Sequence, residues 1–354
     1  MLDPIKPIKG RGATQYLQNR FDQIAYVRDP DADDSEEPLP RTQFLRDTSK
    51  SVIARNDSPD VPHDATLNPY RGCEHGCIYC YARPTHEYLG FSPGLDFETK
   101  IMVKEDAPEL LRETFMKTSW TPQPVGLSGV TDPYQPIERK LRLTRRCLEV
   151  FAEFRNPVSI VTKNRLITRD IDVLSELARH NAVMVMVSVT TLDVSLNRIM
   201  EPRTSLPQQR LDAIAALANA RIPVGVLMAP IVPGLTDEEI PRVLKAAATA
   251  GARWAGYIAL KLPMAVAPLF EAWLTEHLPL KKEKILNRIR SIRGGKLHDS
   301  RFGSRMRGEG FHADHIEQFW RISCGKAGLN QDRFELSASA FRRPPANGQL
   351  ALFE

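Results

Sequence analysis

Three cysteines lie within eight residues of the chain, and their positions, Cys73, Cys77 and Cys80, give the spacing C-x₃-C-x₂-C. Three thiolates can ligate three irons of a cubane iron–sulfur cluster and leave the fourth iron open. Clusters that only carry electrons are usually closed by four cysteines. An open iron is a place where a small molecule can bind and react. We therefore expect these three residues to be the metal ligands of a reactive [4Fe–4S] cluster.

A zinc site is the first alternative for this loop. The same three cysteines could bind Zn²⁺ with His63, His75 or His86 as the fourth ligand. Zinc sites of that type more often combine a C-x₂-C pair with a second, distant pair, and the sequence has no second pair. The spacing therefore favours the open cluster over zinc.

A closed, four-cysteine cluster is the second alternative, and it would need Cys147 or Cys324. Cys147 lies four residues after Leu143 and four before Phe151, on the apolar side of a predicted helix. A cysteine in that position is typical of a small core residue. Cys324 ends a predicted C-terminal helix, and its role stays open.

The cysteine spacing, with Tyr79 and Tyr81 on either side of the last cysteine, resembles the signature of the radical S-adenosylmethionine (SAM) superfamily. This resemblance implies a [4Fe–4S] cluster whose open iron binds SAM, and a reducing electron donor such as flavodoxin or ferredoxin. It also implies an α/β fold, a partial (β/α)₆ TIM-type barrel with N- and C-terminal extensions. In that barrel the cluster lies on the loop after the first strand.

The middle of the chain has the alternation that such a barrel requires, because apolar runs alternate with helical patterns. With a first strand just before Cys73, the pattern predicts about six β/α units. Thr236 with Glu239 is typical of a capping box at the start of one of the helices. The predicted strands are Val125–Thr131, Val158–Thr162, Val183–Val189, Val224–Ile231 and Trp254–Leu260.

Residues that position SAM are expected at the carboxyl ends of these strands, where barrel enzymes place their sites. Ser128 and the backbone of Gly129 lie at the end of the second predicted strand and are candidates for the methionyl amine and carboxylate. Lys163 could pair with the carboxylate, Ser188 could reach the ribose, and the backbone at Ala229 could meet the adenine.

Within the superfamily the sequence resembles the spore photoproduct lyase branch, which is related to DNA repair photolyases, over about residues 63–265. The resemblance implies that the two tyrosines of the cysteine loop border the substrate space. We assign Tyr81 as the candidate catalytic residue and Tyr79 as a cofactor-binding residue, with packing over the cluster as the alternative. The matching segments are Ser128–Glu138, Thr162–Asn164, Ser188, Glu201–Thr204 and Ala229–Ile231.

Two features separate this chain from that branch. Spore photoproduct lyases carry a hydrogen-donating cysteine just before the serine of the second strand, and Leu127 stands in that place here. The carbon–carbon lyase reaction would then lack its hydrogen donor, for which Tyr81 and Cys324 are candidate substitutes. The loop that follows also carries Asp132, Tyr134 and Glu138, which could contact a substrate or hold the loop in place.

The chain ends differ from the middle in charge. We divide the chain into an N-terminal extension (1–60) with an acidic disordered stretch at 29–38, the barrel (61–280) and a basic C-terminal extension (281–354). Residues 281–310 hold ten Lys or Arg and three acidic residues, whereas the whole chain has a net charge of +5. This stretch, and the Arg/Gly segments 9–13 and 293–308, could follow a nucleic-acid backbone. A solvated helix face is the alternative.

Composition is consistent with a globular enzyme. The 354 residues are 42% hydrophobic and 26% charged, and no apolar run reaches the ~20 residues that span a bilayer. The first residues lack the pattern of a secretory signal, and the five cysteines do not form a disulfide framework. We therefore expect a cytoplasmic protein with no membrane contact.

These patterns lead to one principal hypothesis. We expect a radical SAM enzyme that repairs or modifies DNA or RNA. Radical modification of a protein or peptide is a second hypothesis, and a zinc-stabilised nucleic-acid-binding module without catalysis is a third. Binding of oligonucleotides that weakens with salt would favour nucleic acid, because it reports phosphate contacts.

Overall fold

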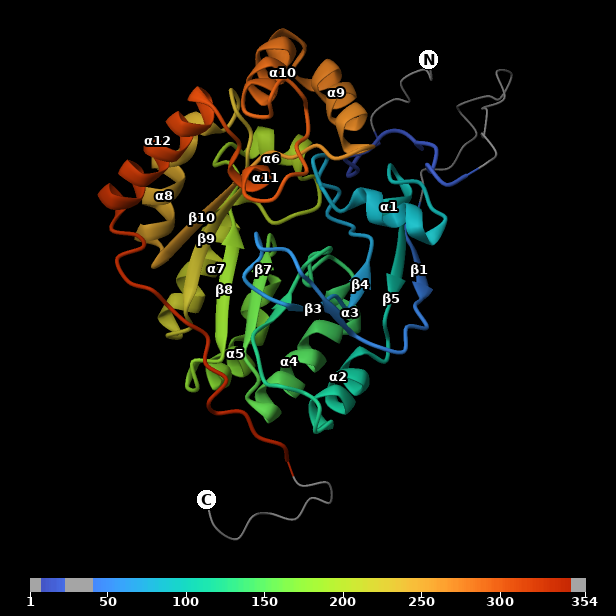
Figure 1. Cartoon of the computed structure of the whole chain (residues 1–354), viewed down its shortest axis with the longest axis vertical. Helices are drawn as coiled ribbons and strands as arrows, with labels where there is room; N and C mark the ends of the chain where they lie inside the picture. The colour runs from blue at the N-terminus through green and yellow to red at the C-terminus, as the bar shows by residue number, and fades with distance from the viewer. Residues whose placement is uncertain (1–7, 23–40, 345–354) are drawn as a thin grey trace.

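A seven-stranded sheet organises the chain (Figure 1), which is described by a computed structural model over residues 8–22 and 41–344. The predicted acidic stretch at 29–38 lies outside these ranges. The strands are arranged in the order β10-β9-β8-β7-β6-β3-β2, and all pairs are parallel except β2 with β3. Their bounds are β2 Ile53–Arg55, β3 Ala65–Leu67, β6 Val125–Leu127, β7 Val158–Thr162, β8 Val183–Ser188, β9 Val224–Ile231 and β10 Trp254–Ala259.

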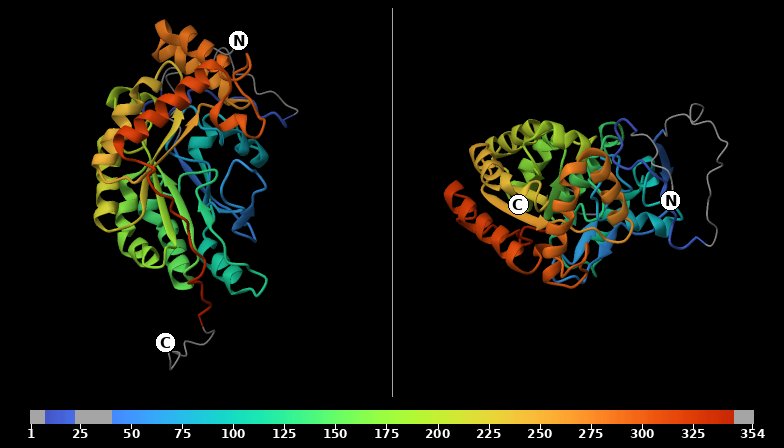
Figure 2. Two further views of the ribbon diagram at one scale, coloured as in Figure 1. Left: turned by 60° about the vertical axis from the view of Figure 1, so that its left-hand side comes forward. Right: turned by 90° about the horizontal axis from the view of Figure 1, so that it is seen from above.

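Six consecutive parallel strands with helices between them make the predicted partial (β/α)₆ fold, which is confirmed. Residues along β7 and β8 alternate between buried and partly buried positions, because successive side chains of a strand point to opposite faces. One face is covered by helices and the other faces the inside of the curved sheet (Figure 2). The helices on the outside are α4 Leu143–Phe154, α5 Ile171–Ala178, α7 Pro207–Asn219 and α8 Ile240–Thr249.

The predicted strand bounds agree closely with the structure, with one instructive exception. The second predicted strand ran to Thr131, but β6 ends at Leu127. The reason is that Ser128 has a φ of 117°, which breaks the extended conformation. The backbone N–H groups of Gly129 and Val130 then donate to the Asn68 side chain at 2.9 Å each instead of to a neighbouring strand.

The predicted capping box at residue 236 is wrong. Thr236 precedes a 3₁₀ turn, η3 (Asp237–Glu239), but its side chain makes no capping hydrogen bond. Glu239 instead accepts hydrogen bonds from the Thr191 hydroxyl at 2.6 Å and the Leu192 N–H at 2.9 Å. The carboxylate therefore fixes the loop after β8 rather than the start of α8.

A second, three-stranded sheet lies beside the first and continues into the cysteine loop. It pairs β1 (Gln43–Arg46) with β5 (Lys100–Val103) and β5 with β4 (Tyr70–Arg71). The 3₁₀ helix η1 (Arg83–Leu89) and the short helix α1 (Asp96–Thr99) lie between β4 and β5 in sequence, and α2 (Ala107–Met116) follows. This small sheet holds both ends of the segment that carries the three cysteines.

The C-terminal residues cover one end and one side of the large sheet (Figure 1). Trp273 of α9 and Ile285 of α10 share a hydrophobic cluster with Ile78 and Tyr79 of the cysteine loop, and α12 packs against α8. The predicted boundaries at residues 60 and 280 stay predictions. The bounds are α9 Val266–His277, η4 Pro279–Lys281, α10 Lys282–Ser291, α11 Ser304–Arg307 and α12 Phe311–Ala327; earlier in the chain lie α3 Glu138–Leu141, η2 Arg165–Asp170 and α6 Val194–Met200.

None of the helices within residues 8–22 and 41–344 is both long and apolar enough to cross a bilayer.

Candidate active site at the carboxyl ends of the strands

The three loop cysteines follow β3 and β4, at the carboxyl end of the first barrel strand. All five cysteines of the chain are free thiols. The backbone of the loop is fixed at two points, because the Cys73 N–H donates to Phe97 O at 2.9 Å and the Ile78 N–H donates to Met200 O at 3.1 Å. Cys73 is buried, whereas Cys77 and Cys80 are partly exposed. The loop is therefore held from both sides and presents two thiols toward the open end of the barrel.

A fully buried ion pair ties this loop to the N-terminal part of the chain. The Arg83 guanidinium lies 2.5 Å from the Glu98 carboxylate and donates to Cys77 O at 2.9 Å. Glu98 also accepts hydrogen bonds from the N–H groups of Gly12 at 3.0 Å and Ala13 at 2.8 Å. Residues 8–22, which we call the N-terminal strap, are thus anchored across the cysteine loop.

Gly12 makes the tightest contact of the strap. A Cβ atom at this position would lie 1.8 Å from Gly76 O in the cysteine loop. We predict that Gly12→Ala lowers the free energy of unfolding by about 1–3 kcal/mol, because the clash is with backbone and cannot be relieved by a rotamer change. Iron content after anaerobic reconstitution should fall as well. Gly325→Ala on α12, where no atom lies within 4 Å, is the control and should retain full iron content.

His75 connects the cysteine loop to the end of β7. Its Nδ1 lies 3.3 Å from the Asp132 carboxylate and its Nε2 lies 3.3 Å from the Asn164 side chain. Asp132 also accepts from the Thr162 hydroxyl at 2.8 Å and the Lys163 N–H at 2.7 Å. Burial alone would lower the pKa of His75, but the Asp132 carboxylate and then the Cys73 thiol raise it to about 10. His75 is therefore a charged link in the scaffold of the loop.

The other two histidines of the zinc hypothesis also have partners elsewhere. His63 Nε2 lies 2.7 Å from the Ser159 hydroxyl inside the sheet, and His86 Nε2 lies 3.0 Å from Lys100 O. In the described ranges, no three His, Cys, Asp or Glu side chains, the loop cysteines included, converge on a point that could hold one metal ion. These positions do not favour the zinc hypothesis.

The residues predicted to bind SAM lie at the ends of adjacent strands. Lys163 follows β7, and its ammonium donates to the backbone carbonyl of Ala229 on β9 at 3.2 Å. Ser188 is the last residue of β8, between these two strands, and is almost fully buried. Its hydroxyl has no hydrogen-bond partner within the described parts of the chain. A buried hydroxyl without a partner is costly, so it indicates a place where a ligand completes the site.

Glu201 is a site residue that the strand-end argument missed. It is fully buried and accepts hydrogen bonds from the Tyr79 hydroxyl, from Arg210, and from Thr190 Oγ1 and Asn197 Nδ2 at 2.9 Å each. Burial alone would raise the pKa of Glu201, but Arg210 and Lys163 lower it to about 2. The Glu201–Thr204 match to the lyase branch was the signal that could have revealed this carboxylate.

Three comparisons connect this geometry to known proteins. Residues 67–247 match the description "Radical SAM superfamily". An uncharacterised protein of Mycobacterium tuberculosis is 36% identical over 258 residues, which cover 71% of this chain and 75% of the relative. An uncharacterised protein of Methanocaldococcus jannaschii is 30% identical over 199 residues, 56% of this chain and 71% of the relative.

The family match, which spans more than half of the chain, decides the assignment. The chain belongs to the radical SAM superfamily. Among solved structures, spore photoproduct lyase complexed with dinucleoside spore photoproduct has a TM-score of 0.57 and 16% identity, covering 81% of this chain and 80% of the lyase chain. A lyase variant with bound AdoMet and dinucleoside spore photoproduct has a TM-score of 0.56 and 15% identity, and it covers the same 81% of this chain and 80% of the lyase chain. These two structures share the fold of this chain.

Members of the superfamily use a [4Fe–4S] cluster and SAM, and the residues of this radical SAM protein fit both. The three thiols of one short loop match the ligand count of a cluster with an open iron. The Lys163 ammonium, the unpartnered Ser188 hydroxyl and the Ala229 backbone are hydrogen-bonding groups of the kinds that a carboxylate, a ribose and an adenine require. Their assignment to particular SAM atoms stays a prediction.

Ser188→Ala is a direct test of that fit. Because the hydroxyl has no partner within the described chain, its removal should leave the free energy of unfolding unchanged or slightly raised. SAM affinity should fall about tenfold, because one hydrogen bond to a ligand contributes about that factor to the binding constant. Equilibrium binding of SAM and a thermal melt measure the two effects. Thr190→Val is the matched contrast, because its hydroxyl already bonds Glu201 and its loss should lower stability.

Tyr79 and Tyr81 lie on opposite sides of the loop. The Tyr79 hydroxyl donates to Glu201, and its ring centre is 6.0 Å from the Lys163 ammonium. The Tyr81 hydroxyl donates to Gly129 O at 2.5 Å, beside Ser128, and its ring is 49% exposed. The cofactor-binding role of Tyr79, Ser128 and Gly129 and the catalytic role of Tyr81 remain predictions. The structure shows that Tyr81 reaches the open end of the barrel.

The loop after β6 is held in place by its own polar residues. Tyr134 and Glu138 are fully buried, and the Tyr134 hydroxyl donates to Asp170 at 3.1 Å. Glu138 accepts from the Tyr70 hydroxyl at 2.6 Å and from Arg169 at 2.8 Å. Of the two functions considered for these side chains, the structure supports that of holding the loop.

Leu127 does not face the inside of the sheet. Ser159 of β7 and Gly126 of β6 pair in register, and both lie beside His63 on the inner face. Leu127 alternates with Gly126 and is buried in the main hydrophobic core with its partner Ile160. A cysteine at position 127 would therefore point toward the helices, away from the place where a hydrogen donor could meet a substrate.

The remaining two cysteines lie outside the site. Cys147 is fully buried on α4 in the main core, as predicted. Cys324 lies on α12, where Asn330 Nδ2 is 3.9 Å from its sulfur, and it packs in the same core. Because α12 covers the outside of the sheet beside α8 (Figure 1), the structure does not support Cys324 as a hydrogen donor.

The Arg/Gly segments are less available to phosphate than the sequence suggested. Arg11 donates to Glu98 O at 2.8 Å and to the Thr42 hydroxyl at 2.9 Å. Arg293 is buried and donates to four backbone carbonyls, among them Ala259 O at 2.9 Å. Both arginines therefore hold other segments of the chain in place, and binding of a nucleic acid by these segments stays a prediction.

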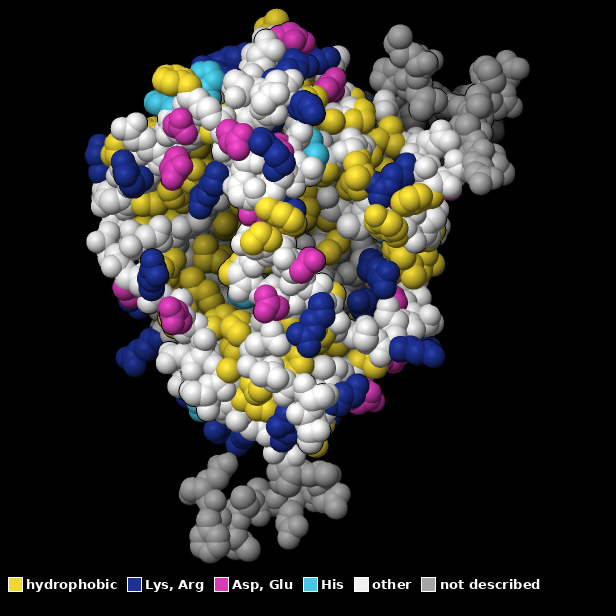
Figure 3. Space-filling model, in the orientation of Figure 1, with side chains coloured by type: hydrophobic (Ala, Val, Ile, Leu, Met, Phe, Trp, Pro, Cys, Tyr) yellow, Lys and Arg dark blue, Asp and Glu magenta, His cyan; other side chains and the backbone are white. Residues whose placement is uncertain are grey.

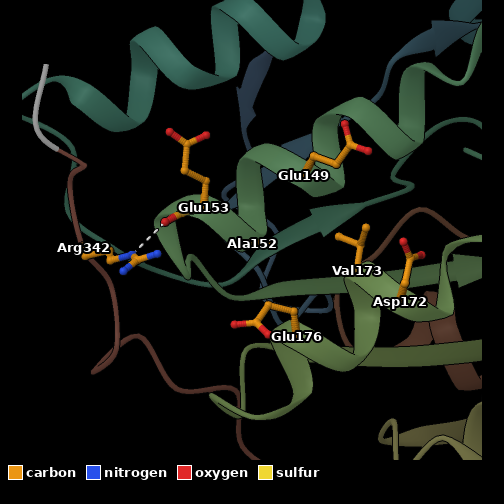
Figure 4. A pocket seen from close by; sticks show the side chains of 7 residues that line it. All are labelled: Glu149, Ala152, Glu153, Asp172, Val173, Glu176 and Arg342. Atoms are coloured by element: carbon orange, nitrogen blue, oxygen red, sulfur yellow. Dashed lines mark hydrogen bonds between the residues drawn. The ribbon is translucent and has the colours of Figure 1, made fainter. Parts of the chain in front are cut away.

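An acidic hollow lies between α4 and α5 (Figure 4), at the opposite end of the barrel. Arg342 donates to Glu153 O at 3.1 Å there, close to where α4 leads into the amino end of β7. The hollow is lined by Glu149, Ala152, Glu153, Asp172, Val173, Glu176 and Arg342. It is separate from the cysteine loop.

Proposed function

We propose that this radical SAM protein cleaves SAM to a 5′-deoxyadenosyl radical and directs that radical at DNA or RNA, in a repair or modification reaction. The observation that carries the proposal is the three-thiol loop beside the Lys163 ammonium and the unpartnered Ser188 hydroxyl. When bound, the cluster supplies one electron that breaks a sulfur–carbon bond of SAM.

The chain's own residues supply binding, orientation and shielding. The Arg83–Glu98 pair and His75 fix the loop. Lys163 and Ser188 would orient the cofactor, and Glu201 holds the Tyr79 hydroxyl. The inner face of the sheet is open beside the site, since residues of β8, β9 and β10 that face it are only partly buried. Figure 3 shows a hollow with mainly hydrophobic side chains over β8, β9 and β10.

Nucleic acid is favoured over peptide as the substrate for two reasons. The solved structure with the same fold is described as complexed with a dinucleoside photoproduct. In addition, Lys261 lies beside the exposed ring of Tyr81, and Arg305, which is close enough for its charge to act on Lys261, lies beside the exposed ring of Phe302. Cations interleaved with aromatic rings suit a phosphate backbone and its bases.

Anaerobic reconstitution followed by EPR of the reduced protein tests the chemistry. A [4Fe–4S]⁺ signal that changes on addition of SAM, with 5′-deoxyadenosine as a product, supports the proposal. A colourless protein that contains zinc would overturn it. Incubation with irradiated or unmodified oligonucleotides, followed by mass spectrometry, then tests the substrate class, and products found only with peptides would favour the peptide hypothesis.

We also propose a reducing, cytoplasmic setting and an electron donor such as flavodoxin or ferredoxin, because an open cluster is damaged by oxygen and must be reduced at low potential. Comparison of 5′-deoxyadenosine formation with flavodoxin and with dithionite measures whether such a protein can deliver the electron.

A further inference from the structure

Lys261 is a cation at the mouth of the barrel that the cofactor chemistry does not use. It lies two residues after the end of β10. Its ammonium is 4.5 Å from the centre of the Tyr81 ring and 3.6 Å from Met306 Sδ. Among the described residues, no carboxylate forms an ion pair with it. The Asp60 carboxylate is close enough to act on its charge, but it is paired with Arg305. Lys261 therefore lacks the contacting anionic partner that partly buried lysines usually have.

The surroundings of Lys261 carry excess positive charge. Arg293 lies nearby with its guanidinium bonded only to backbone carbonyls, so its charge is not paired by a contacting carboxylate. Arg305 is paired with Asp60 at 2.5 Å. Burial, then Arg305 and Arg293, lower the pKa of Lys261 to about 8. Burial disfavours a charge of either sign, but the positive charges of Arg305 and Arg293, which also lower this pKa, favour an anion at the same place.

A second unsatisfied group lies in the same neighbourhood. His298 is close enough to Lys261, Arg293 and Arg305 for their charges to act on it. Its Nδ1 is buried and has no hydrogen-bond partner within the described parts of the chain. Burial, with these cations, lowers the pKa of His298, so the ring is neutral at pH 7 and can offer a hydrogen bond.

Two exposed aromatic rings flank these cations. Tyr81 is 49% exposed and Phe302 is 58% exposed. The Arg305 guanidinium lies 4.5 Å from the Phe302 ring centre, the same separation as that of Lys261 from Tyr81. Rings of this kind are usually buried in a protein core, whereas proteins that bind single strands expose them so that bases can stack. The two ring–cation pairs lie at the end of the barrel where the cysteine loop opens.

We propose that Lys261 binds a backbone phosphate of the nucleic-acid substrate, with the rings of Tyr81 and Phe302 available to the adjoining bases. This proposal rests on the proposed function and names the group that anchors that substrate. A phosphate at Lys261 would place its nucleotide beside Tyr81, the residue that follows the last cluster cysteine. It would also compensate the excess positive charge around Lys261 and Arg293.

The test measures the affinity of the full-length, cluster-loaded protein, with SAM present, for a short fluorescent single-stranded oligonucleotide. Fluorescence anisotropy over a range of KCl concentrations gives both the affinity and its dependence on salt. We expect Lys261→Met to lower affinity about tenfold at low salt, the effect of one charge-assisted hydrogen bond. The slope of log K against log salt should also become shallower by about 0.7, the contribution of one phosphate on a single strand.

Three further variants make the result specific. Lys261→Arg should retain most of the affinity and the full slope. Phe302→Ala should lower affinity about tenfold without changing the slope, because stacking releases no counterions. Lys326→Met, an exposed lysine of α12 on the outside of the fold, should change neither quantity. Thermal melts should show that all four variants are folded, since each side chain is exposed or partly exposed.

The outcomes separate this inference from the proposed function. If the wild-type protein binds and Lys261→Met binds equally well with the same slope, the phosphate site is wrong and the nucleic-acid substrate stands. If Lys326→Met weakens binding as much as Lys261→Met does, the weaker binding comes from the loss of net positive charge rather than from a specific site, and the proposed phosphate site is again wrong. If the wild-type protein binds neither DNA nor RNA at low salt, both the substrate class and the site are overturned, although SAM cleavage can still be present.

Discussion

Replacing Cys77 by alanine will abolish formation of 5′-deoxyadenosine. The loop supplies three thiols, and a cluster with an open iron requires all three. With two thiols left, the iron–sulfur cluster will not assemble stably, so the loss should be at least about a thousandfold, to the level of the cluster-free protein. Iron content, the EPR signal of the reduced protein and product formation measure the effect together. Cys73→Ala and Cys80→Ala should behave in the same way.

Cys147→Ala is the matched control, because it removes the same side chain from a different environment. Cys147 is fully buried on α4 in the main core. Its replacement should lower the free energy of unfolding by about 1 kcal/mol, as expected for a small cavity, while iron content and product formation are retained. If Cys77→Ala keeps its iron and its EPR signal while Cys147→Ala loses them, the assignment of ligands is wrong.

Arg210→Met will cause the largest loss of stability of the variants considered. Arg210 and Glu201 are both fully buried and form an ion pair. Removing one partner leaves an uncompensated buried charge, which costs about 3–5 kcal/mol. The Tyr79 hydroxyl and Thr190 share the same carboxylate, so SAM affinity should fall too. Chemical denaturation gives the first quantity and equilibrium SAM binding the second.

An exposed ion pair provides the control for that substitution. Arg253 pairs with Asp332 at the surface, where such pairs contribute about 0–1 kcal/mol. Arg253→Met should therefore leave both stability and SAM affinity almost unchanged. Equal losses in the two variants would show that the buried pair around Glu201 is no more important than a surface contact.

The same carboxylate predicts how stability depends on pH. Arg210 and Lys163 lower the pKa of Glu201 to about 2 in the folded chain, from its ordinary value of 4.5. A group with a depressed pKa stabilises the folded state above its unfolded pKa and loses that contribution as the pH falls through the folded pKa. Wild-type stability should therefore fall between about pH 4.5 and pH 2 more steeply than that of Glu201→Gln. Denaturation of the cluster-free protein across this range measures the difference.

The sheet could be predicted well from sequence because its strands follow local rules. β7 and β9 begin and end at the predicted residues, since apolar runs bounded by polar or glycine residues mark buried parallel strands. The exceptions came from contacts between distant residues. β6 ends early because the Asn68 side chain accepts hydrogen bonds from the N–H groups of Gly129 and Val130. Glu239 does not cap a helix because it accepts a hydrogen bond from Thr191 in the loop after β8. A local sequence pattern does not predict contacts with side chains that are distant in the sequence.

Some features of the candidate site could also be predicted from the sequence, and others could not. The sequence by itself predicted the three candidate ligands, because the thiols of one cluster can lie on one short loop, and their count and spacing are local. It also determined that Lys163 and Ser188 would lie at neighbouring strand ends, because parallel strands align their carboxyl ends. Only the tertiary structure decided which buried carboxylate holds Tyr79, and that Leu127 faces the core.

The tertiary structure also decided the charges around the site. Arg83 meets Glu98 fifteen residues away, Arg210 meets Glu201, and Arg305 meets Asp60 across 245 residues. Lys261 and Arg293 are close enough for their charges to repel each other, and neither forms an ion pair with a carboxylate within the described residues. The physical reason is that an electrostatic interaction depends on distance in space and on exclusion of water, neither of which is fixed by residue spacing. The ligand set expected of the cysteine loop can thus be predicted from the sequence. The electrostatic environment around the loop can be described only from the folded structure.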